Sequence, residues 1–500
     1  MRNPMSTRIV AVAVPLLLTA TAALAGETAK SAFAPPPQFA SISSDAYLGK
    51  VDQAEFWKRF DDAKLTGLVE QALRKNHDLR IAMARFDSAN ALLRATKFDR
   101  LPTVTAQANA SHSKLSSDQA AGIPGGDRNA HSYDAGASLS WELDLFGRVR
   151  NGVNAQTAET QATADDLRAL QVAIVAEVAS DYFSLRGLQE RLRVAQENET
   201  SQAQTLRIIE AGLDAGRGTE FDSARARSQW ETTSSRLPAL RAEISATTRH
   251  LAVLTGQFPE ALDAELSSTK ALGDLPPNVN PGTPGDVLLR RPDVAAAQAR
   301  LAAATARIGV ARADLFPRFT LGGLLGTQAV HSDSLFEHGS ETHLVALGID
   351  WSFLDFGRVR ARLAAAHANA DGELARYEQV VLRAIEETEN ALVRYDEARH
   401  QDEHLIRAAT DSANALQLAR VRYKAGAIGF FEVLDAERSN LQAQDAAAQQ
   451  RAQSYADLVG VYKALAGGWP EVSPHSEQVG QVSGTVSPKT DSATRSQPSA

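Results

Sequence analysis

Residues 141–150 read WELDLFGRVR, and residues 351–360 read WSFLDFGRVR. Six of the ten positions agree across this spacing of 210 residues: Trp141/Trp351, Phe146/Phe356, Gly147/Gly357, Arg148/Arg358, Val149/Val359 and Arg150/Arg360. The similarity continues outside the decapeptide, because Gly216/Gly426 and Phe221/Phe431 have the same spacing. Further upstream the spacing is 215, from Asp78/Asp293 and Pro102/Pro317. Self-similarity of this kind is typical of a duplicated architecture. We therefore expect two copies of one structural unit, residues 60–256 and 284–469.

The segments outside the two copies have distinct compositions. Arg2 and Arg8 precede an apolar run and a small-residue motif at 23–25, which predicts a secretory signal peptide over residues 1–25. Residues 26–59 lead into the first copy, and a Pro- and Gly-rich connector, 257–283, joins the two copies. The tail, 470–500, is rich in Ser, Thr and Gln and has too few apolar residues to fold. The signal peptide predicts that the mature chain leaves the cytoplasm.

The composition excludes several classes of protein. The 500-residue chain has a net charge of −8, so no basic surface for nucleic acid is expected. It has no cysteine, so we expect no disulfide bonds and no lipid anchor on a cysteine after the cleavage site. After the signal peptide, no stretch approaches the ~20 apolar residues of a membrane-spanning helix.

Each copy is predicted to contain one long helix, two strands and then two more long helices. Proline is absent from Arg148 to Leu237 and from Arg318 to Trp469. In the first of these stretches apolar residues recur at spacings of three and four: Ile174, Val178, Tyr182, Leu185, Leu188 and Leu192. We expect helices over about 148–212 and 359–423, each reaching ~100 Å and packing as in a coiled coil.

The predicted strands alternate strictly between apolar and polar residues. From Tyr133 to Leu145 every odd position is apolar and every even position is polar or glycine. Residues 345–353 repeat this pattern, and residues 103–111 and 319–328 show it more weakly. Strands of this length fit a tilted crossing of a bilayer, although a half-buried strand of a soluble sheet alternates in the same way. Aromatic residues near one strand end and the signal peptide favour the membrane.

Four strands per chain cannot close a barrel, and an open sheet edge cannot face lipid. If these strands cross a membrane, several chains must therefore combine their strands. The sequence itself does not set the number of chains.

Three further stretches carry a resemblance to a known family. They are Leu288-Leu-Arg-Arg-Pro-Asp-Val294 with its continuation to Pro317, Phe56-Trp-Lys-Arg-Phe-Asp61, and Leu458–Trp469. Together they resemble the TolC-like outer-membrane efflux factors, NodT branch, over about residues 50–470. The resemblance implies a mixed α/β membrane protein: a homotrimer whose four strands per chain form a 12-stranded outer-membrane β-barrel, continued by a long α-helical periplasmic barrel. It also implies a passive exit duct that works with a periplasmic adaptor protein and an inner-membrane efflux transporter. Residues 26–59 would then lie in the periplasm.

The resemblance assigns roles to two sets of joints in the chain. At the strand–helix junctions, Trp141 and Trp351 would lie at the aqueous boundary, and Gly147 and Gly357 would allow a sharp change of backbone direction. The tip turns carry Gly216 and Asp222 in the first copy and Gly426 in the second, and they would lie at the periplasmic tip where the adaptor docks.

The second tip turn is also the predicted gate of the duct. Phe431, Asp435 and Arg438 follow one another at i, i+4 and i+7 and therefore share a helix face. By resemblance they would line a constriction, with Tyr423 and Glu432 beside them. Threefold symmetry would bring three Asp435 carboxylates into a ring that attracts cations. The plainer interpretation of Asp435 and Arg438 is an ordinary surface ion pair.

Other functions are less well supported by the sequence. His400 and His404 fit the H-x-x-E-H zinc-protease pattern, but a long polar helix surface, where such residues are normally solvated, explains them better. We expect no enzyme activity, no metal and no cofactor. The acidic residues Asp134, Glu142, Asp144 and Asp350 are expected to line a water-filled interior. A type I protein secretion channel and a periplasmic coiled-coil adaptor without a pore remain as alternatives.

Overall fold

The computed structural model describes residues 36–40, 55–275 and 279–466, except 117, 120, 121, 123 and 125–127. The chain divides into two units, Met1–Pro36 and Pro37–Ala500, and every element below belongs to the second. The predicted signal peptide, most of segment 26–59 and the tail from 470 lie outside the described residues.

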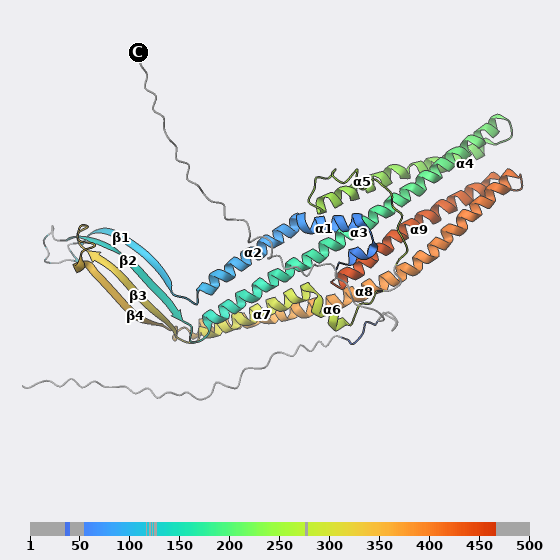
Figure 1. Ribbon diagram of the computed structural model, residues 1–500. Coiled ribbons are helices and arrows are strands. Elements are labelled where there is room, and N and C mark those ends of the chain that lie inside the picture. The colour runs from blue at the N-terminus through green and yellow to red at the C-terminus, as the bar shows by residue number, and fades with distance from the viewer. Residues whose placement is uncertain are drawn as a thin grey trace, which may run out of the picture. The chain divides into compact units, whose positions relative to one another are not determined.

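The elements follow the predicted order of helix, strands and helices twice (Figure 1). They are η2 (Phe56–Phe60), α1 (Ala63–Lys75), α2 (His77–Phe98), β1 (Thr103–Lys114), β2 (Asn129–Leu143), α3 (Arg148–Asp214), α4 (Glu220–Ser234), α5 (Arg236–Leu254), α6 (Pro284–Arg290), α7 (Pro292–Ala313), β3 (Arg318–Ala329), η3 (His338–Ser340), β4 (Glu341–Asp350), α8 (Phe356–Lys424) and α9 (Phe430–Ala464). In Figure 1 the strands lie at one end of the helices, and the turns α3–α4 and α8–α9 lie at the other end.

The long helices are confirmed. Helix α3 has 67 residues and α8 has 69, so each is about 100 Å long at 1.5 Å per residue. No helix among the described residues combines the length and apolarity that crossing a membrane requires.

The single helix predicted at the start of each copy is wrong, because each copy has two. In the first copy Asn76 ends α1 and caps α2, accepting hydrogen bonds from the backbone amides of Asp78 and Leu79 at 2.9 and 3.1 Å. In the second copy the break falls at Arg291, 215 residues later, immediately before Pro292. A capping asparagine and a proline at the first helical position are both helix-start signals, so each divides the predicted helix.

The two breaks are held in place by equivalent bonds. The side-chain amide of Asn76 donates to the carbonyl of Leu254 at 2.9 Å, at the end of α5. The guanidinium of Arg291 donates to the carbonyl of Ala464 at 3.1 Å, at the end of α9. Leu254 and Ala464 are 210 residues apart, so corresponding residues of the two predicted copies make corresponding contacts.

The last helix differs between the copies. In the second copy α9 runs unbroken for 35 residues, whereas the first copy is divided at Ser235 into α4 and α5. Pro238 explains the difference, since proline is tolerated in the first turn of a helix but interrupts a helix interior. The prediction of one long helix after the first tip turn is therefore wrong.

The four strands form one antiparallel sheet in the order β1-β2-β3-β4. The predicted strands are confirmed, with different ends: β2 stops at Leu143 and β4 stops at Asp350, so Leu145 and Trp351 lie outside them. In Figure 1 the sheet extends away from the described helices.

The register places the alternating residues of all four strands on common faces. Leu139 lies opposite Val104 of β1 and Gly323 of β3, and Leu321 lies opposite Trp141 and Leu347. One face therefore carries the apolar side chains of every strand, and the other carries residues such as Ser138, Ser140 and Thr320. Leu324 and Leu344 are exceptions, because they lie opposite each other on the polar face. The apolar face is uncovered: Val345, Leu347 and Ile349 are 79%, 61% and 64% exposed.

The largest core lies midway along the helices, where α1, α3, α5 and α9 meet. The connector contributes to this core through Leu262 and Leu266, which are almost fully buried. Its backbone is bonded to α3, since Gln189 donates to the carbonyl of Leu266 at 2.6 Å and Arg186 donates to that of Ser268 at 2.5 Å. The connector is thus a packed part of the fold.

Candidate functional site

The strand–helix junctions are held by the two predicted tryptophans. The indole nitrogen of Trp141 donates to the carbonyl of Arg100 at 3.1 Å, and that of Trp351 donates to the carbonyl of Leu315 at 3.2 Å. Arg100 and Leu315 are 215 residues apart, so the two junctions repeat one contact. The Trp141 bond joins the end of β2 to the loop before β1. The Trp351 bond joins the end of β4 to the loop before β3.

The two junction glycines differ in conformation. Gly147 has φ 79° and precedes the first residue of α3, as expected for a sharp turn. The prediction for Gly357 is wrong, because this residue lies within the first turn of α8 and is not among the positive-φ glycines. The cause is Asp144, whose carboxylate accepts from the amides of Val149 and Arg150 at 3.0 and 2.8 Å and fixes the start of α3. The second copy has Leu354 at this place, which cannot cap, and α8 begins at Phe356.

The acidic residues near the first junction are bound to protein. Glu142 forms an ion pair with Arg148 through two hydrogen bonds, and Asp144 caps α3. Both side chains remain partly exposed, and the expectation that they line a water-filled interior stays a prediction. Asp134 accepts from the side-chain amide of Asn109 at 3.0 Å on the polar face of the sheet.

Both tip turns end their helices in the same way. Gly216 has φ 70° and Gly426 has φ 72°. In each turn the glycine amide donates three residues back, to Leu213 at 2.8 Å and to Tyr423 at 2.9 Å. The following amide donates five residues back at 2.8 and 2.9 Å, which completes a Schellman motif. Both glycines thus lie at the left-handed position that ends α3 and α8.

The helix after each tip turn starts differently. Thr219 caps α4: its hydroxyl accepts from the amide of Asp222 at 3.1 Å and donates to the Asp222 carboxylate at 2.6 Å. In the second copy Gly429 precedes α9 without a side-chain cap, and Glu432 lies in the first turn. An acidic side chain there interacts favourably with the positive end of the helix dipole.

Four of the predicted gate residues, Phe431, Glu432, Asp435 and Arg438, occupy the exposed side of α9, and Tyr423 lies on α8. Asp435 and Arg438 form an ion pair at 2.7 Å, with side chains 49% and 59% exposed. Phe431 is 54% exposed, and the guanidinium of Arg225 on α4 lies 4.7 Å from its ring centre. Tyr423 is half-buried and contacts the ring of Phe430, with 5.9 Å between the centroids. The structure therefore pairs Asp435 with Arg438 but brings Phe431 to the neighbouring hairpin of the same chain.

Arg225 links the tips of the two copies. Its guanidinium lies 5.1 Å from the ring centre of Phe221 as well as 4.7 Å from that of Phe431. Phe221 and Phe431 are equivalent residues of the two predicted copies. Contacts of a cation with aromatic faces contribute about 0.5–1 kcal/mol each at exposed sites. Beneath them a small apolar cluster joins the hairpins: Leu206, Ile209, Ala226, Phe430 and Val433.

A buried polar layer lies next to this cluster, and the sequence analysis did not find it. We use the term polar layer for Ser201, Gln202 and Thr205 of α3, Arg420 of α8 and Glu437 of α9. Glu437 is 1% exposed, and its Oε1 accepts from Arg420 at 2.8 Å and from Thr205 at 3.4 Å. Arg420 also donates to the hydroxyl of Ser201.

The polar layer is incompletely bonded. Within the described part of the chain, Oε2 of Glu437 and both polar atoms of the Gln202 amide have no hydrogen-bond partner, although Gln202 is only 3% exposed. Buried polar atoms without a partner cost about 1–3 kcal/mol each. The sequence does contain a pattern that predicts burial of Glu437. Phe430, Val433 and Glu437 follow at i, i+3 and i+7 and define the buried stripe of α9.

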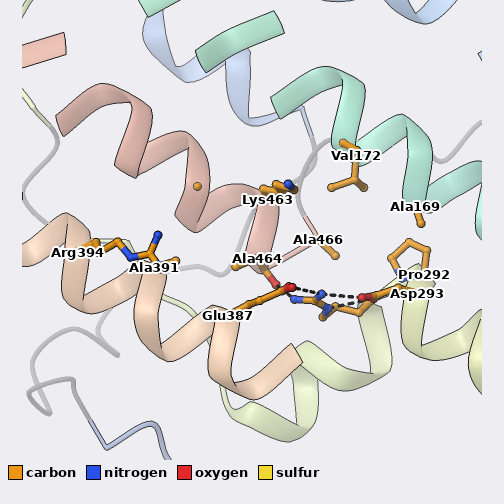
Figure 2. Close-up of a pocket in the computed structure, with 13 residues that line it drawn as sticks. Ala169, Val172, Pro292, Asp293, Glu387, Ala391, Arg394, Lys463, Ala464 and Ala466 are labelled. Carbon is orange, nitrogen blue, oxygen red and sulfur yellow. Dashed lines mark hydrogen bonds and ion pairs between the residues drawn. The ribbon is translucent and has the colours of Figure 1, made fainter. Parts of the chain in front are cut away.

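A pocket of about 420 Å³ lies where α3, α7, α8 and the end of α9 meet (Figure 2). Arg291 forms ion pairs there with Asp293 at 2.6 Å and with Glu387 at 2.7 Å. Burial alone lowers the pKa of the Arg291 guanidinium, but the bonds to these two carboxylates outweigh burial, so its pKa lies above the ordinary value. Arg291 also donates to the carbonyl of Ala464, so it joins α7, α8 and the end of α9. We therefore interpret this pocket as structural.

The two histidines of the zinc-like pattern on α8 have different neighbours. His400 faces Asp396 at 4.0 Å, whereas His404 lies 3.3 Å from a guanidinium nitrogen of Arg407. In the described ranges no group of three or more His, Cys, Asp or Glu is arranged to hold a metal ion.

Comparison with known proteins adds the family. The model of the outer membrane efflux protein family matches residues 68–257 and 283–467. Outer membrane protein OprJ of Pseudomonas aeruginosa is 34% identical over 430 residues, which cover 83% of this chain and 86% of OprJ. The pyoverdine export outer membrane protein OpmQ of Pseudomonas putida is 33% identical over 465 residues, covering 92% of this chain and 97% of OpmQ.

Solved structures agree with the sequence comparison. The outer-membrane channel OprN superimposes with a TM-score of 0.80 at 40% identity, over 87% of this chain and 98% of OprN. CusC superimposes with a TM-score of 0.76 at 27% identity, over 87% of this chain and 97% of CusC. Among the relatives, SilC of Salmonella typhimurium is named a probable outer membrane lipoprotein. The predicted leader of the present chain lies outside the described residues.

Proposed function

Because this chain belongs to the outer membrane efflux protein family, we propose that it is the outer-membrane channel of a tripartite efflux system, a passive duct without enzymatic activity. The observation that carries the proposal is the sheet. Four strands present one apolar face that no other described part of the chain covers, as the 79% exposure of Val345 illustrates. A lipid bilayer accounts for an uncovered apolar face of this size, and a soluble sheet does not.

Closure of the sheet requires other subunits. In the described residues β1 and β4 are the outer strands and present unpaired backbone groups. Such groups are too costly to expose to lipid, so β4 of one subunit is proposed to pair with β1 of the next. Three copies would supply twelve strands and, below them, the helices of a periplasmic tunnel. The long helices and the relationship to solved channels support this homotrimer.

Duplication of one unit explains how the tunnel wall is built. The family model matches two separate ranges, 68–257 and 283–467. Equivalent bonds at Asn76 and Arg291, and at Trp141 and Trp351, support the proposed copies 60–256 and 284–469. Each copy contributes one pair of strands and one helical hairpin.

The gate is proposed to lie at the tip turns. In a trimer the exposed side of α9 would face the threefold axis, with Asp435, Arg438 and Phe431 at the constriction and Tyr423 and Glu432 beside it. Three Asp435 carboxylates near one axis would repel one another unless each is paired, and the ion pair with Arg438 at 2.7 Å supplies that partner. The tip around Gly216, Asp222 and Gly426 would be the docking surface for a periplasmic adaptor.

The relatives indicate the kind of cargo and partners. Their names include a pyoverdine export protein, a solvent efflux pump protein and a cation efflux protein. We propose that this chain likewise releases small molecules or ions that an inner-membrane transporter delivers. Export of polypeptides, as in a type I secretion system, remains the alternative, and a pore-free adaptor is disfavoured by the uncovered sheet.

Single-channel recording tests the proposal. Full-length protein purified from membranes in detergent should sediment as a trimer and should insert into planar bilayers with a small resting conductance. The double variant Asp435→Ala/Arg438→Ala should raise that conductance. The control is Glu373→Ala/Arg376→Ala, which removes an i,i+3 ion pair of α8 at 2.8 Å, with side chains 24% and 61% exposed. A monomer that stays in solution without detergent would refute the channel, and equal conductance of wild type and the Asp435/Arg438 variant would refute the gate alone.

A further inference from the structure

Two histidines face each other at the end of the sheet farthest from the helices. His112 of β1 lies directly opposite His131 of β2, next to the last pairs of the ladder. Their ring centroids are 4.4 Å apart, and the ring planes differ by 34°. Both side chains are exposed. This pair has no part in the proposed conduction path.

The pair projects from the apolar face of the sheet. Even residues of β1 and odd residues of β2 share this face, so His112 and His131 lie beside Tyr133 and on the same side as Val104 and Leu139. The ring of Tyr133 lies 6.5 Å from that of His131 and is almost parallel to it. Pairing of β1 with another subunit would use backbone groups only. The two histidines lie beyond Tyr133, near the strand ends, so lipid on the apolar residues would leave them in water.

The spacing of the rings matches a particular coordination geometry. A metal ion binds an imidazole nitrogen at about 2.0–2.1 Å, which places the ring centre about 3.2 Å from the metal. Two rings bound at 90° to each other would then have centroids about 4.5 Å apart, and two bound at the tetrahedral angle would have them about 5.2 Å apart. The observed centroid distance of 4.4 Å is close to the first value, while the 34° between the ring planes requires rotation of the side chains before both rings can bind one ion.

Adjacent positions at 90° occur in square-planar and tetragonal complexes, which Cu²⁺ and Ni²⁺ prefer. Imidazole is a good ligand for both ions, and Cu²⁺ binds more tightly in the general order of divalent metals. The chain has no cysteine, so no thiolate competes for the ion elsewhere. Among the described residues no third His, Cys, Asp or Glu joins the pair, so water would occupy the remaining positions.

We propose that His112 and His131 form a two-histidine site for Cu²⁺, and more weakly for Ni²⁺, that links β1 to β2 at this end of the sheet. The site goes beyond the transport function, since it would bind an ion at the surface and would not conduct it. A bound ion would hold the two strand ends together next to the loop that joins them.

Titration with CuCl₂, followed by electron paramagnetic resonance, tests the site. The sample is full-length protein in detergent without a histidine tag. We expect one tightly bound Cu²⁺ per chain, with a tetragonal spectrum that shows nitrogen coupling. His112→Ala and His131→Ala should each weaken binding at least about tenfold, which corresponds to 1.4 kcal/mol.

The matched control is His343→Ala, which removes an exposed histidine from the same face on β4. This variant should bind Cu²⁺ as the wild type does. Equal weakening by all three variants, or by none, would show dispersed binding and would overturn the proposal. Unchanged electrophoretic migration of the native oligomer shows that each variant is folded, so a loss of copper binding reports on the ligands.

Discussion

Replacing Glu437 by leucine should loosen the tip of the helical hairpins. This carboxylate is 1% exposed and holds Arg420 of α8 at 2.8 Å and Thr205 of α3 at 3.4 Å. It therefore joins three helices at once, directly below the small apolar cluster that unites the two tips. With leucine at this place, Arg420 would keep its charge and lose its carboxylate partner.

The size of the effect follows from the exposure of the two partners. Removing one member of a fully buried ion pair costs about 3–5 kcal/mol. The side chain of Arg420 is 39% exposed, so water replaces part of the lost interaction, and Oε2 of Glu437 has no partner to lose. We therefore expect Glu437→Leu to lower the free energy of local opening at the tip by about 2 kcal/mol.

Hydrogen–deuterium exchange of the native protein measures this opening directly. Amides of residues 430–441 should exchange about 30-fold faster in Glu437→Leu, since 1.4 kcal/mol is a factor of ten. The double variant Arg420→Met/Glu437→Leu should exchange as slowly as wild type or more slowly, because an apolar pair of similar size removes the unpaired charge. Amides near Leu185, in the central core, should be unaffected in both variants.

A matched control separates this buried pair from an exposed one. Asp435→Ala removes the exposed ion pair with Arg438, which contributes only about 0.2–0.5 kcal/mol, so exchange should change about twofold at most. The reasoning is wrong if Glu437→Leu exchanges within threefold of wild type. It is also wrong if the double variant exchanges as fast as the single variant.

Three further outcomes follow from the described contacts. Gly147→Ala should destabilise the protein by about 1–2 kcal/mol because φ is 79°. Gly357→Ala, in the first turn of α8, should be neutral or slightly stabilising. The temperature at which each variant loses its native electrophoretic form compares the two. Burial alone raises the pKa of Asp62, but the bond from Tyr182 and the other hydrogen bonds outweigh burial and lower it below 3.8. The carboxylate therefore stabilises the fold above this pH and loses its contribution as the pH falls through the folded-state pKa. The melting temperature of Asp62→Asn should accordingly lie below wild type at pH 7, and the difference should shrink as the pH falls below 3.8. Trp141→Phe should cost about 1 kcal/mol through its lost hydrogen bond, as measured by the same electrophoretic assay.

Periodicity predicted most of the fold because its helices and strands are long. An apolar stripe over many turns identifies α3, and strict alternation over the interval 133–143 identifies β2. The helix breaks at Asn76 and Arg291 were missed because a single residue causes each of them. A cap or a first-turn proline changes the hydrogen bonds of one turn only, and the apolar stripe continues on both sides of it.

The repeat of the decapeptide led to the wrong prediction at Gly357. The decapeptides share Gly147 and Gly357, but they differ at Asp144 and Leu354, and the capping carboxylate at 144 decides where the helix begins. Six identities in ten aligned positions therefore reveal the repeat, while one substituted side chain decides the local backbone.

At the tip, too, the sequence motif and the local packing point to different residues of α9. Phe431, Asp435 and Arg438 share the exposed side of α9, and Phe430, Val433 and Glu437 share its buried side, only one residue out of phase. A sequence motif draws attention to the exposed set, because charged and aromatic residues there resemble a gate. The energy that holds the hairpins together lies in the buried set, where Glu437 interrupts an apolar stripe and leaves polar atoms without partners. If the tip opens, water can hydrate these unpaired atoms, so separation at the polar layer costs less than separation of an apolar layer of the same size would. The exposed residues would follow that movement.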